Sequence, residues 1–194
     1  MSRCYTVGVG AEHRYVAGSA WLNLLATLGH AYGAVPIERL GDVEALRAWL
    51  DHERLTPAAP LAAADVEQAK AFRETLRPVV LAVLDERTPD VAPLQAWLDA
   101  DEPLRVVVKD GRPAAAPPST IAAALARLAR QAVEQLPEAA LGACADDGCR
   151  MAFLDPGGRR RWCAPETCGV KARVRAHRAR ARQPDAAAGA PSSH

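Results

Sequence analysis

Large apolar side chains recur every three to four residues in most of the first 136 positions, which is the spacing of helices buried on one face. Five segments show this pattern: residues 19–32, 43–50, 63–87, 90–99 and 119–136. Three of these segments have a residue suited to N-capping at or just before their first turn: Ser19, Asp42, and Ser119 or Thr120. Pro78 lies inside the longest segment, so we expect a kink or a split there. The aromatic residues at helical spacing are expected to form a core.

Strand patterns are fewer and shorter. Residues 5–9 alternate weakly, whereas residues 104–108 read Leu-Arg-Val-Val-Val and are followed by the turn signal Asp110-Gly111. This predicts a small hairpin, after which the proline-rich residues 113–118 are expected to form a loop. We therefore predict a mainly α N-terminal domain over residues 1–138 that contains a small β-hairpin.

The composition narrows the class of protein. Hydrophobic residues make up 49% of the 194 residues, which is enough for a true core. No apolar run approaches the roughly 18 residues of a membrane span, and residues 1–7 lack the apolar region of a signal peptide. These features predict a cytoplasmic protein with no membrane partner, in which thiols stay reduced. Cys4 stands alone and is interpreted as an ordinary small apolar residue.

Four further cysteines have a spacing that indicates a specific chemistry. Cys144, Cys149, Cys163 and Cys168 form two C-x4-C steps separated by 13 residues. Two such pairs can close a tetrahedral thiolate cage around one Zn²⁺ ion. Two disulfides, four unrelated thiols, and a redox or iron–sulfur role are the alternatives. Four sulfur ligands would leave no open coordination position, so a zinc ion here is expected to be structural rather than catalytic.

The segment around these cysteines, residues 139–182, is too short to fold by hydrophobic burial alone. A structural metal would supply the missing folding free energy. Gly148 and Gly169 are expected to adopt a positive φ beside the sulfur atoms, and residues 155–158 to form a tight turn between the two cysteine pairs. We predict a zinc-stapled finger built from a β-hairpin and a helix, followed by a disordered tail over residues 183–194.

Charge is distributed unevenly along the chain. Residues 141–182 contain ten Lys/Arg and four Asp/Glu, a net charge of +6, whereas residues 1–140 contain 14 and 18, a net charge of −4. A zinc–tetrathiolate cage contributes a formal −2 and leaves the finger at about +4. Such a surplus suits a phosphate backbone. The candidate DNA contacts are Arg159, Arg160, Arg161, Lys171, Arg173, Arg175, Arg178 and Arg182.

Other interpretations of these positive charges are weighed beside DNA. A helix over residues 169–182 would place Val170 and Val174 one turn apart, where they can pack on Phe153 or Trp162. The charges around them can then serve solubility, or dock on an acidic surface such as the N-terminal domain. RNA is a weaker candidate because no platform of exposed aromatic residues is evident.

An enzyme is the least favoured class. His13, His30 and His52 belong to no Ser/His/Asp or Cys/His arrangement, and the chain has neither a P-loop nor a G-x-G-x-x-G motif. We therefore expect no catalytic residues.

The cysteine segment resembles a known family. The shared features are the first C-x4-C step, Phe-Leu-Asp at 153–155, Arg-Arg-Trp-Cys at 160–163, Cys-Gly at 168–169 and Ala-Arg-Val-Arg-Ala-His-Arg at 172–178. Together they are similar to the CGNR-type zinc finger over roughly residues 141–182. That family joins the finger to a helical domain called ABATE, described as a stress-induced transcription regulator. The resemblance implies that the four cysteines bind zinc and that the finger binds DNA.

Two departures from the family pattern bear on function. Val170 and Lys171 replace Asn and Arg of the name-giving tetrad, which removes an amide and a bidentate guanidinium. Residues 22–27 are similar to the family's L-D-F-x-N-T stretch, with Asn23 in place of Asp and Ala26 in place of Asn. If the polar positions of this stretch form a ligand site in relatives, Asn23 and Thr27 are the candidates here.

The sequence thus predicts a transcription regulator that binds DNA through its zinc finger. Its helical domain would sense a small-molecule signal or mediate homodimerisation. The alternative is a protein–protein interaction module with a purely structural zinc and a basic helix that docks on an acidic surface.

Overall fold

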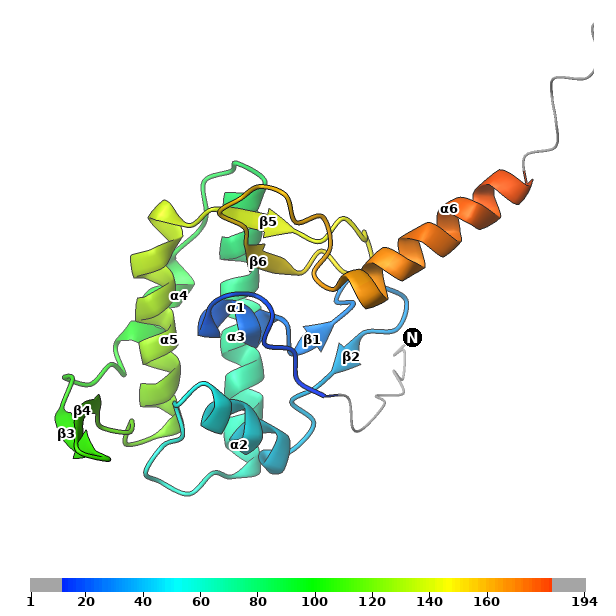
Figure 1. Cartoon of the computed structure of the whole chain (residues 1–194). Helices are drawn as coiled ribbons and strands as arrows, with labels where there is room; N and C mark the ends of the chain where they lie inside the picture. Colours follow the sequence, from blue (N-terminus) through cyan, green and yellow to red (C-terminus); the bar gives the residue numbers. More distant parts are fainter. Residues whose placement is uncertain (1–11, 183–194) are drawn as a thin grey trace, which may run out of the picture.

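A long central helix organises the chain, and the computed structural model describes residues 12–182 around it (Figure 1). Cys4, the expected strand at 5–9 and the tail 183–194 lie outside the described residues. The helices are α1 (Ala20–Leu25), α2 (Val43–His52), α3 (Ala63–Leu84), α4 (Ala92–Leu98), α5 (Ile121–Gln135) and α6 (Val170–Arg182). The central helix, α3, contacts α1, α2, α4 and α5. This is the helix-rich N-terminal region that the sequence predicts.

Three two-stranded antiparallel sheets complete the fold. They are β1 (Leu28–Gly29) with β2 (Ile37–Glu38), β3 (Val106–Lys109) with β4 (Arg112–Ala115), and β5 (Leu141–Ala143) with β6 (Ala152–Leu154). The predicted hairpin after residue 104 is β3–β4, and Asp110 and Gly111 form its turn at φ +52° and +74°. The prediction that residues 113–118 form only a loop is wrong, because residues 113–115 belong to β4.

Two of the predicted N-caps use their side chains as expected. Asp42 accepts a hydrogen bond from the Ala45 amide at 2.8 Å, and Thr120, rather than Ser119, accepts one from the Ala123 amide at 3.3 Å. Ser19 occupies the N-cap position of α1, but its hydroxyl donates to Gln135 at 2.9 Å instead of capping the helix. A hydroxyl at a helix start can thus be recruited by a neighbouring element.

The first helix is shorter than its pattern indicates. The predicted helix over 19–32 is wrong beyond Leu25, because the chain turns there and enters β1. The turn is closed at Thr27, whose amide donates to the Leu24 carbonyl at 3.1 Å and whose carbonyl accepts from the Arg39 amide at 2.9 Å. This backbone pairing brings residues 27 and 39 together, and the β1–β2 hairpin begins at that point.

The expected split at Pro78 does not occur, since α3 runs unbroken from 63 to 84. Pro78 lies on the exposed side of the helix, whereas its neighbours Leu76, Val79 and Val80 are buried. Packing on both sides of the proline therefore offsets the missing backbone hydrogen bond.

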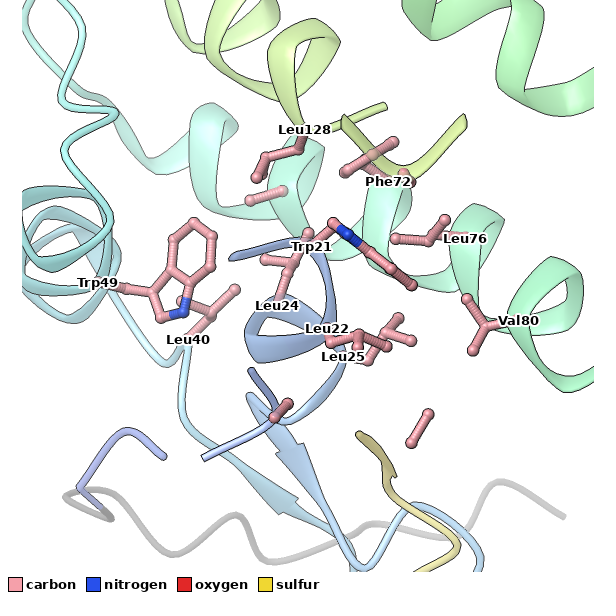
Figure 2. Packing of buried hydrophobic residues seen from close by; sticks show 14 of the residues in the cluster. Trp21, Leu22, Leu24, Leu25, Leu40, Trp49, Phe72, Leu76, Val80 and Leu128 are labelled. Atoms are coloured by element: carbon pink, nitrogen blue, oxygen red, sulfur yellow. The ribbon is translucent and has the colours of Figure 1, made fainter. Parts of the chain in front are cut away.

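One apolar core spans the helical region and the cysteine segment. Trp21, Trp49 and Phe72 are fully buried in it, which confirms that these aromatic residues are core residues (Figure 2). Phe153 and the four C-terminal cysteines belong to the same cluster. The finger therefore rests on the helical region and shares its core.

A buried ion pair fixes the β1–β2 hairpin to the central helix. The Arg73 guanidinium in α3 donates two hydrogen bonds to the Glu38 carboxylate in β2, at 2.8 and 2.7 Å, and a third to the Thr27 hydroxyl at 2.9 Å. The loop that this hairpin carries then reaches the finger, where the Tyr32 amide donates to the Gly148 carbonyl at 3.2 Å. Nothing in the local pattern of the sequence signals this pair.

Candidate metal centre and basic finger

The first cysteine pair is held by the β5–β6 hairpin. Cys144 follows β5 and Cys149 precedes β6, and the two strands pair in the register Leu141↔Leu154 and Ala143↔Ala152. The Cys144 amide donates to the Met151 carbonyl at 2.9 Å, and the Cys149 amide to the Asp146 carbonyl at 2.7 Å. These bonds close the loop between the strands and turn both thiols to one side.

The second pair lies beyond the turn predicted at 155–158. The Gly158 amide donates to the Asp155 carbonyl at 3.0 Å, which confirms that turn. The chain then reaches Cys163 without forming a further strand in this described stretch. Cys168 lies in the wide helical turn Pro165–Gly169, where its amide donates to the Ala164 carbonyl at 2.9 Å. This turn leads directly into α6.

The four sulfur atoms converge on one buried point. All four Sγ atoms lie within 4.8 Å of one another, with 3.6 Å between Cys149 and Cys163 and 3.5 Å between Cys163 and Cys168. A tetrahedral site with zinc–sulfur bonds of about 2.3 Å has sulfur–sulfur distances near 3.8 Å. None of the four cysteines forms a disulfide. The arrangement fits a tetrahedral metal site.

The thiols perturb one another's protonation. Hydrogen bonds from Cys149 and Cys163 hold the pKa of Cys144 far below its usual range, whereas their bonds to Cys144 raise the pKa of those two thiols. Burial raises the pKa of Cys168 to about 12. A divalent metal bound here would favour the ionised form of all four thiols.

Neighbouring groups pack against the two glycines beside the cysteines. The expected positive φ at Gly148 and Gly169 is wrong, since the left-handed residue of this loop is Arg150 at φ +43°. A Cβ atom on Gly169 would lie 3.2 Å from the Trp162 ring, and one on Gly148 would lie 3.4 Å from the Gly33 backbone. The Trp162 ring thus packs closely on Gly169, whereas the contact of Gly148 with Gly33 is an ordinary one.

A buried guanidinium that the sequence does not predict lies near the thiol cluster. Arg39 donates to the Glu12 and Ala26 carbonyls at 2.9 and 3.2 Å. Burial lowers the pKa of Arg39, and the nearby Cys149 and Cys163 oppose that shift. A Cβ atom on Gly29 would lie 2.3 Å from this guanidinium, so Gly29 leaves the space that Arg39 occupies.

A buried carboxylate joins the first cysteine loop to α6. Asp146 accepts hydrogen bonds from Arg175 at 2.9 Å and from the Gly148 amide at 3.2 Å. Burial by itself raises the pKa of Asp146, but these two bonds outweigh it and leave the pKa below its usual range. Next to it, Lys171 donates to Nε2 of His30 at 2.8 Å, and burial and this ammonium lower the pKa of His30. The first turns of α6 are thereby oriented by two polar contacts.

The predicted DNA contacts separate into inward and outward groups, and Arg160 is turned inward. Its guanidinium donates to the carbonyls of Val16 at 2.7 Å, Trp162 at 3.1 Å and Cys163, and it stacks 4.1 Å from the centre of the Phe153 ring. Arg160 thus ties the finger to the segment before α1. Its neighbours Arg159 and Arg161 are exposed.

The last helix projects away from the rest of the molecule (Figure 1). Val170 and Val174 are 40% and 42% exposed, so the prediction that they pack on Phe153 or Trp162 is wrong. Among the described residues, Arg173, Arg178 and Arg180 are exposed and have no hydrogen-bond or ion-pair partner. Lys171 and Arg175 are exposed but engaged, and the Arg182 side chain lies outside the described residues.

The candidate ligand residues of the N-terminal region are buried and bonded within the protein. Asn23 accepts from the Ala17 amide at 3.0 Å and donates to Glu53 at 2.9 Å. Thr27 donates to the Leu24 carbonyl at 2.6 Å and accepts from Arg73. Both residues therefore help to hold α1 in place, and a ligand role for them stays a prediction.

Comparison with known families gives two matches in the order expected from the sequence. A family model named ABATE, described as "putative stress-induced transcription regulator", matches residues 18–139. A second model, the CGNR zinc finger, matches residues 140–181. No curated protein matches the chain. Between residues 12 and 182, no helix has the length and apolar character needed to cross a membrane.

Proposed function

Since this chain belongs to the ABATE family and carries a CGNR zinc finger, we propose that it is a transcription regulator that binds DNA through that finger. In this proposal the helical region supports the finger and the finger meets the nucleic acid. The role is one of binding rather than catalysis, and it agrees with the cytoplasmic location expected from the sequence.

One zinc ion would be held by the thiolates of Cys144, Cys149, Cys163 and Cys168. Their convergence within 4.8 Å and their burial support a closed site with four sulfur ligands. When bound, the metal would supply charge compensation for the thiolates and folding free energy for the finger. It would leave no position for a substrate.

The observation that carries the proposal is the set of exposed arginines on the projecting helix α6 that are unpaired among the described residues. Arg173, Arg178 and Arg180 are exposed on a helix that extends beyond the body of the protein (Figure 1). Guanidinium groups on such a helix can contact successive phosphates, and each contact releases a counterion. Arg159 and Arg161 add exposed positive charge to the finger. The surface suits a polyanion that passes alongside the finger.

The altered tetrad suggests how this finger differs from the family pattern. Lys171 replaces Arg, and its ammonium contacts His30 of the N-terminal region at 2.8 Å. An ammonium is a point charge without the planar, bidentate fork of a guanidinium. We infer that position 171 helps to orient α6 and that binding rests mainly on phosphate contacts.

The alternative is a basic helix that docks on an acidic protein surface. Among the described residues, the carboxylate paired with α6 is Asp146, which belongs to the finger itself. The helix is therefore not docked on the acidic helical region, and its free arginines favour an external polyanion. Sensing of a small-molecule signal and homodimerisation remain proposals for the helical region.

The proposal is tested by removing the three free arginines of α6 together. Zinc-loaded Arg173→Ala/Arg178→Ala/Arg180→Ala should bind a labelled DNA duplex about tenfold or more weakly than the wild type in low salt, measured by fluorescence anisotropy. Arg47→Ala/Arg87→Ala/Arg112→Ala removes the same charge from exposed positions elsewhere and should change affinity by less than about threefold. Equal losses in both variants, or no binding by the wild type, would contradict the proposal.

A further inference from the structure

The β3–β4 hairpin exposes apolar side chains on both of its faces. Val106 and Val108 are 69% and 78% exposed, and Val107, which points to the opposite face, is 40% exposed. Leu104, just before the strand, is also exposed. Both faces of β3 are exposed along its whole length. Figure 1 shows the hairpin at the margin of the molecule, far from the finger.

The backbone of β3 leaves one edge available for pairing. The turn closes at Lys109↔Arg112, and the Ala116 amide donates to the Arg105 carbonyl at 2.8 Å. Because antiparallel ladders alternate, Val106 and Val108 then occupy the pairs that are not hydrogen-bonded within the hairpin. Their N–H and C=O groups point to the outer edge of β3. That edge offers two donor–acceptor pairs to a further strand.

The opposite edge of the hairpin is protected. Pro113 in β4 pairs with Val108, and its missing N–H is the one that would point away from β3. Proline on an edge strand discourages strand addition. The hairpin is therefore asymmetric, with the edge of β4 blunted and the edge of β3 open.

The base of the hairpin is anchored to the body. The Ala58 and Ala59 amides donate to the Pro118 and Ser119 carbonyls at 2.8 and 3.0 Å, and Arg127 donates to the Ala116 carbonyl at 2.8 Å. An anchored strand presents a pre-organised template, which lowers the entropic cost of pairing with a partner.

Positive charge brackets the open edge. Arg105 and Lys109 flank the three valines and, among the described residues, neither side chain has a hydrogen-bond or ion-pair partner. Arg105 and Arg127 also line a hollow of about 270 Å³ at the base of the hairpin, together with Glu102, whose carboxylate is bonded to Ser119. The Nε of Arg127 is buried there without an acceptor. The surroundings thus favour acidic groups at the ends of a partner strand.

We propose that the edge of β3 binds an extended segment of a partner protein, with apolar residues at its centre and acidic residues on both sides. The segment would add antiparallel to β3, so that its acidic residues lie opposite Arg105 and Lys109 and its apolar residues lie beside Val106 and Val108. Main-chain hydrogen bonds would supply the pairing, and the flanking charges would select the partner.

A second copy of the chain suits this edge less well. Two antiparallel β3 strands paired about Val107 would place Arg105 of each copy directly opposite Lys109 of the other copy. Like charges directly opposite each other destabilise a strand pair. Charge complementarity therefore favours an acidic partner segment.

The test uses the full-length zinc-loaded protein and two labelled peptides. The acidic peptide Ser-Glu-Val-Thr-Val-Glu-Ser should bind at least about tenfold more tightly than Ser-Lys-Val-Thr-Val-Lys-Ser, as measured by fluorescence anisotropy. The double variant Arg105→Glu/Lys109→Glu should reverse this preference. Arg173→Ala/Arg178→Ala/Arg180→Ala should bind the acidic peptide like the wild type, because α6 takes no part in this site.

A backbone variant separates strand addition from simple charge attraction. Val108→Pro removes an outward N–H that the β3–β4 ladder does not use, and it should weaken binding of the acidic peptide by about tenfold. Far-UV circular dichroism checks that the fold is kept, and the charge-reversed variant keeps the proposal testable if it is not. Equal binding of both peptides, or unchanged binding by Val108→Pro, would overturn the proposal. Self-association that is lost in Val108→Pro, without peptide binding, would assign the edge to a second copy instead.

Discussion

Arg159, Arg160 and Arg161 are neighbours of one type that have different roles. In the sequence they form a single basic cluster, but in the structure Arg160 donates to three backbone carbonyls, whereas its neighbours are exposed. A cluster of like charges identifies a basic segment. Which member faces inward depends on the carbonyls that the fold brings near it.

Arg160→Ala is therefore expected to lower the free energy of unfolding by about 2–4 kcal/mol, because it leaves partly buried carbonyls without a donor and removes the contact with Phe153. Arg159→Ala should change it by no more than about 0.5 kcal/mol. Urea denaturation of both zinc-loaded variants measures the difference. Equal losses would show that Arg160 is an ordinary surface residue.

The Glu38–Arg73 pair gives a pH-dependent prediction. Burial by itself raises the pKa of Glu38, but the hydrogen bonds from Arg73 outweigh it and hold the pKa in the folded protein below its usual range. The stabilisation is therefore fully present above the pKa of the unfolded chain and is lost as pH falls through the folded pKa. Glu38→Gln should lower the free energy of unfolding by about 3 kcal/mol at pH 7, and this loss should shrink toward zero as the pH falls below about 4.

The control for that series is a surface pair in α3. Glu67, which is exposed, pairs with Lys70 at 2.8 Å. Glu67→Gln should lower the free energy of unfolding by no more than about 0.5 kcal/mol at any of these pH values. A loss for Glu38→Gln that did not vary with pH would mean that charge is not what stabilises the pair.

The cysteines could be predicted from the sequence, whereas the polar groups around them could not. Repeated C-x4-C steps place four ligands within a short loop-rich segment, so their convergence follows from spacing alone. Arg39 reaches the cysteines from just after β2, where it donates to the Ala26 carbonyl, whereas Asp146 lies within the first C-x4-C step and is bonded by Arg175 of α6. Such contacts depend on how the elements pack, and no local pattern encodes them.

At the scale of elements, the β5–β6 hairpin depends on one glycine. Gly142 pairs with Phe153, and a Cβ atom there would lie 2.7 Å from the fully buried ring. Gly142→Ala is expected to lose about 1–3 kcal/mol of stability through overpacking. At Gly41 no atom lies within 4 Å of a new Cβ. Gly41→Ala should therefore change the free energy of unfolding by no more than about 0.5 kcal/mol. Thermal unfolding of both variants tests this, and equal melting temperatures would contradict it.

Element prediction succeeded where pattern and end signals agreed. The predicted segment 43–50 follows the N-cap Asp42 and has one apolar face, and it forms all but the last two residues of α2. In contrast, residues 28–32 continue the apolar spacing of α1 but belong to β1 and its loop. Backbone pairing between residues 27 and 39 replaces helical hydrogen bonds there. A long-range pairing of this kind overrides local periodicity.

At the scale of the whole molecule, the finger and the helical region share one core. The cysteines and Phe153 lie in the same buried cluster as Trp21. The Leu154 amide also donates to the Ala17 carbonyl at 2.8 Å, and Arg150 pairs with Asp85 at 2.9 Å. Each contact links the finger to the helical region, so the two should unfold together.

Metal removal should therefore destabilise the entire chain. We expect a chelator to lower the melting temperature that the helical signal in far-UV circular dichroism reports. The free energy of unfolding should fall by several kcal/mol. The same single transition should appear in the fluorescence of the buried tryptophans. An unchanged helical transition in the chelated protein would show that the helical region is independent of the cage.

The central claim is that the finger binds DNA through the free arginines of α6, and the salt dependence of DNA affinity tests it most directly. A plot of log affinity against log salt concentration has a slope of about −0.9 for each phosphate contact. We predict that Arg173→Ala/Arg178→Ala/Arg180→Ala reduces the magnitude of that slope by about 2–3, whereas Arg47→Ala/Arg87→Ala/Arg112→Ala leaves it unchanged. Identical slopes for the wild type and the α6 variant would contradict the account.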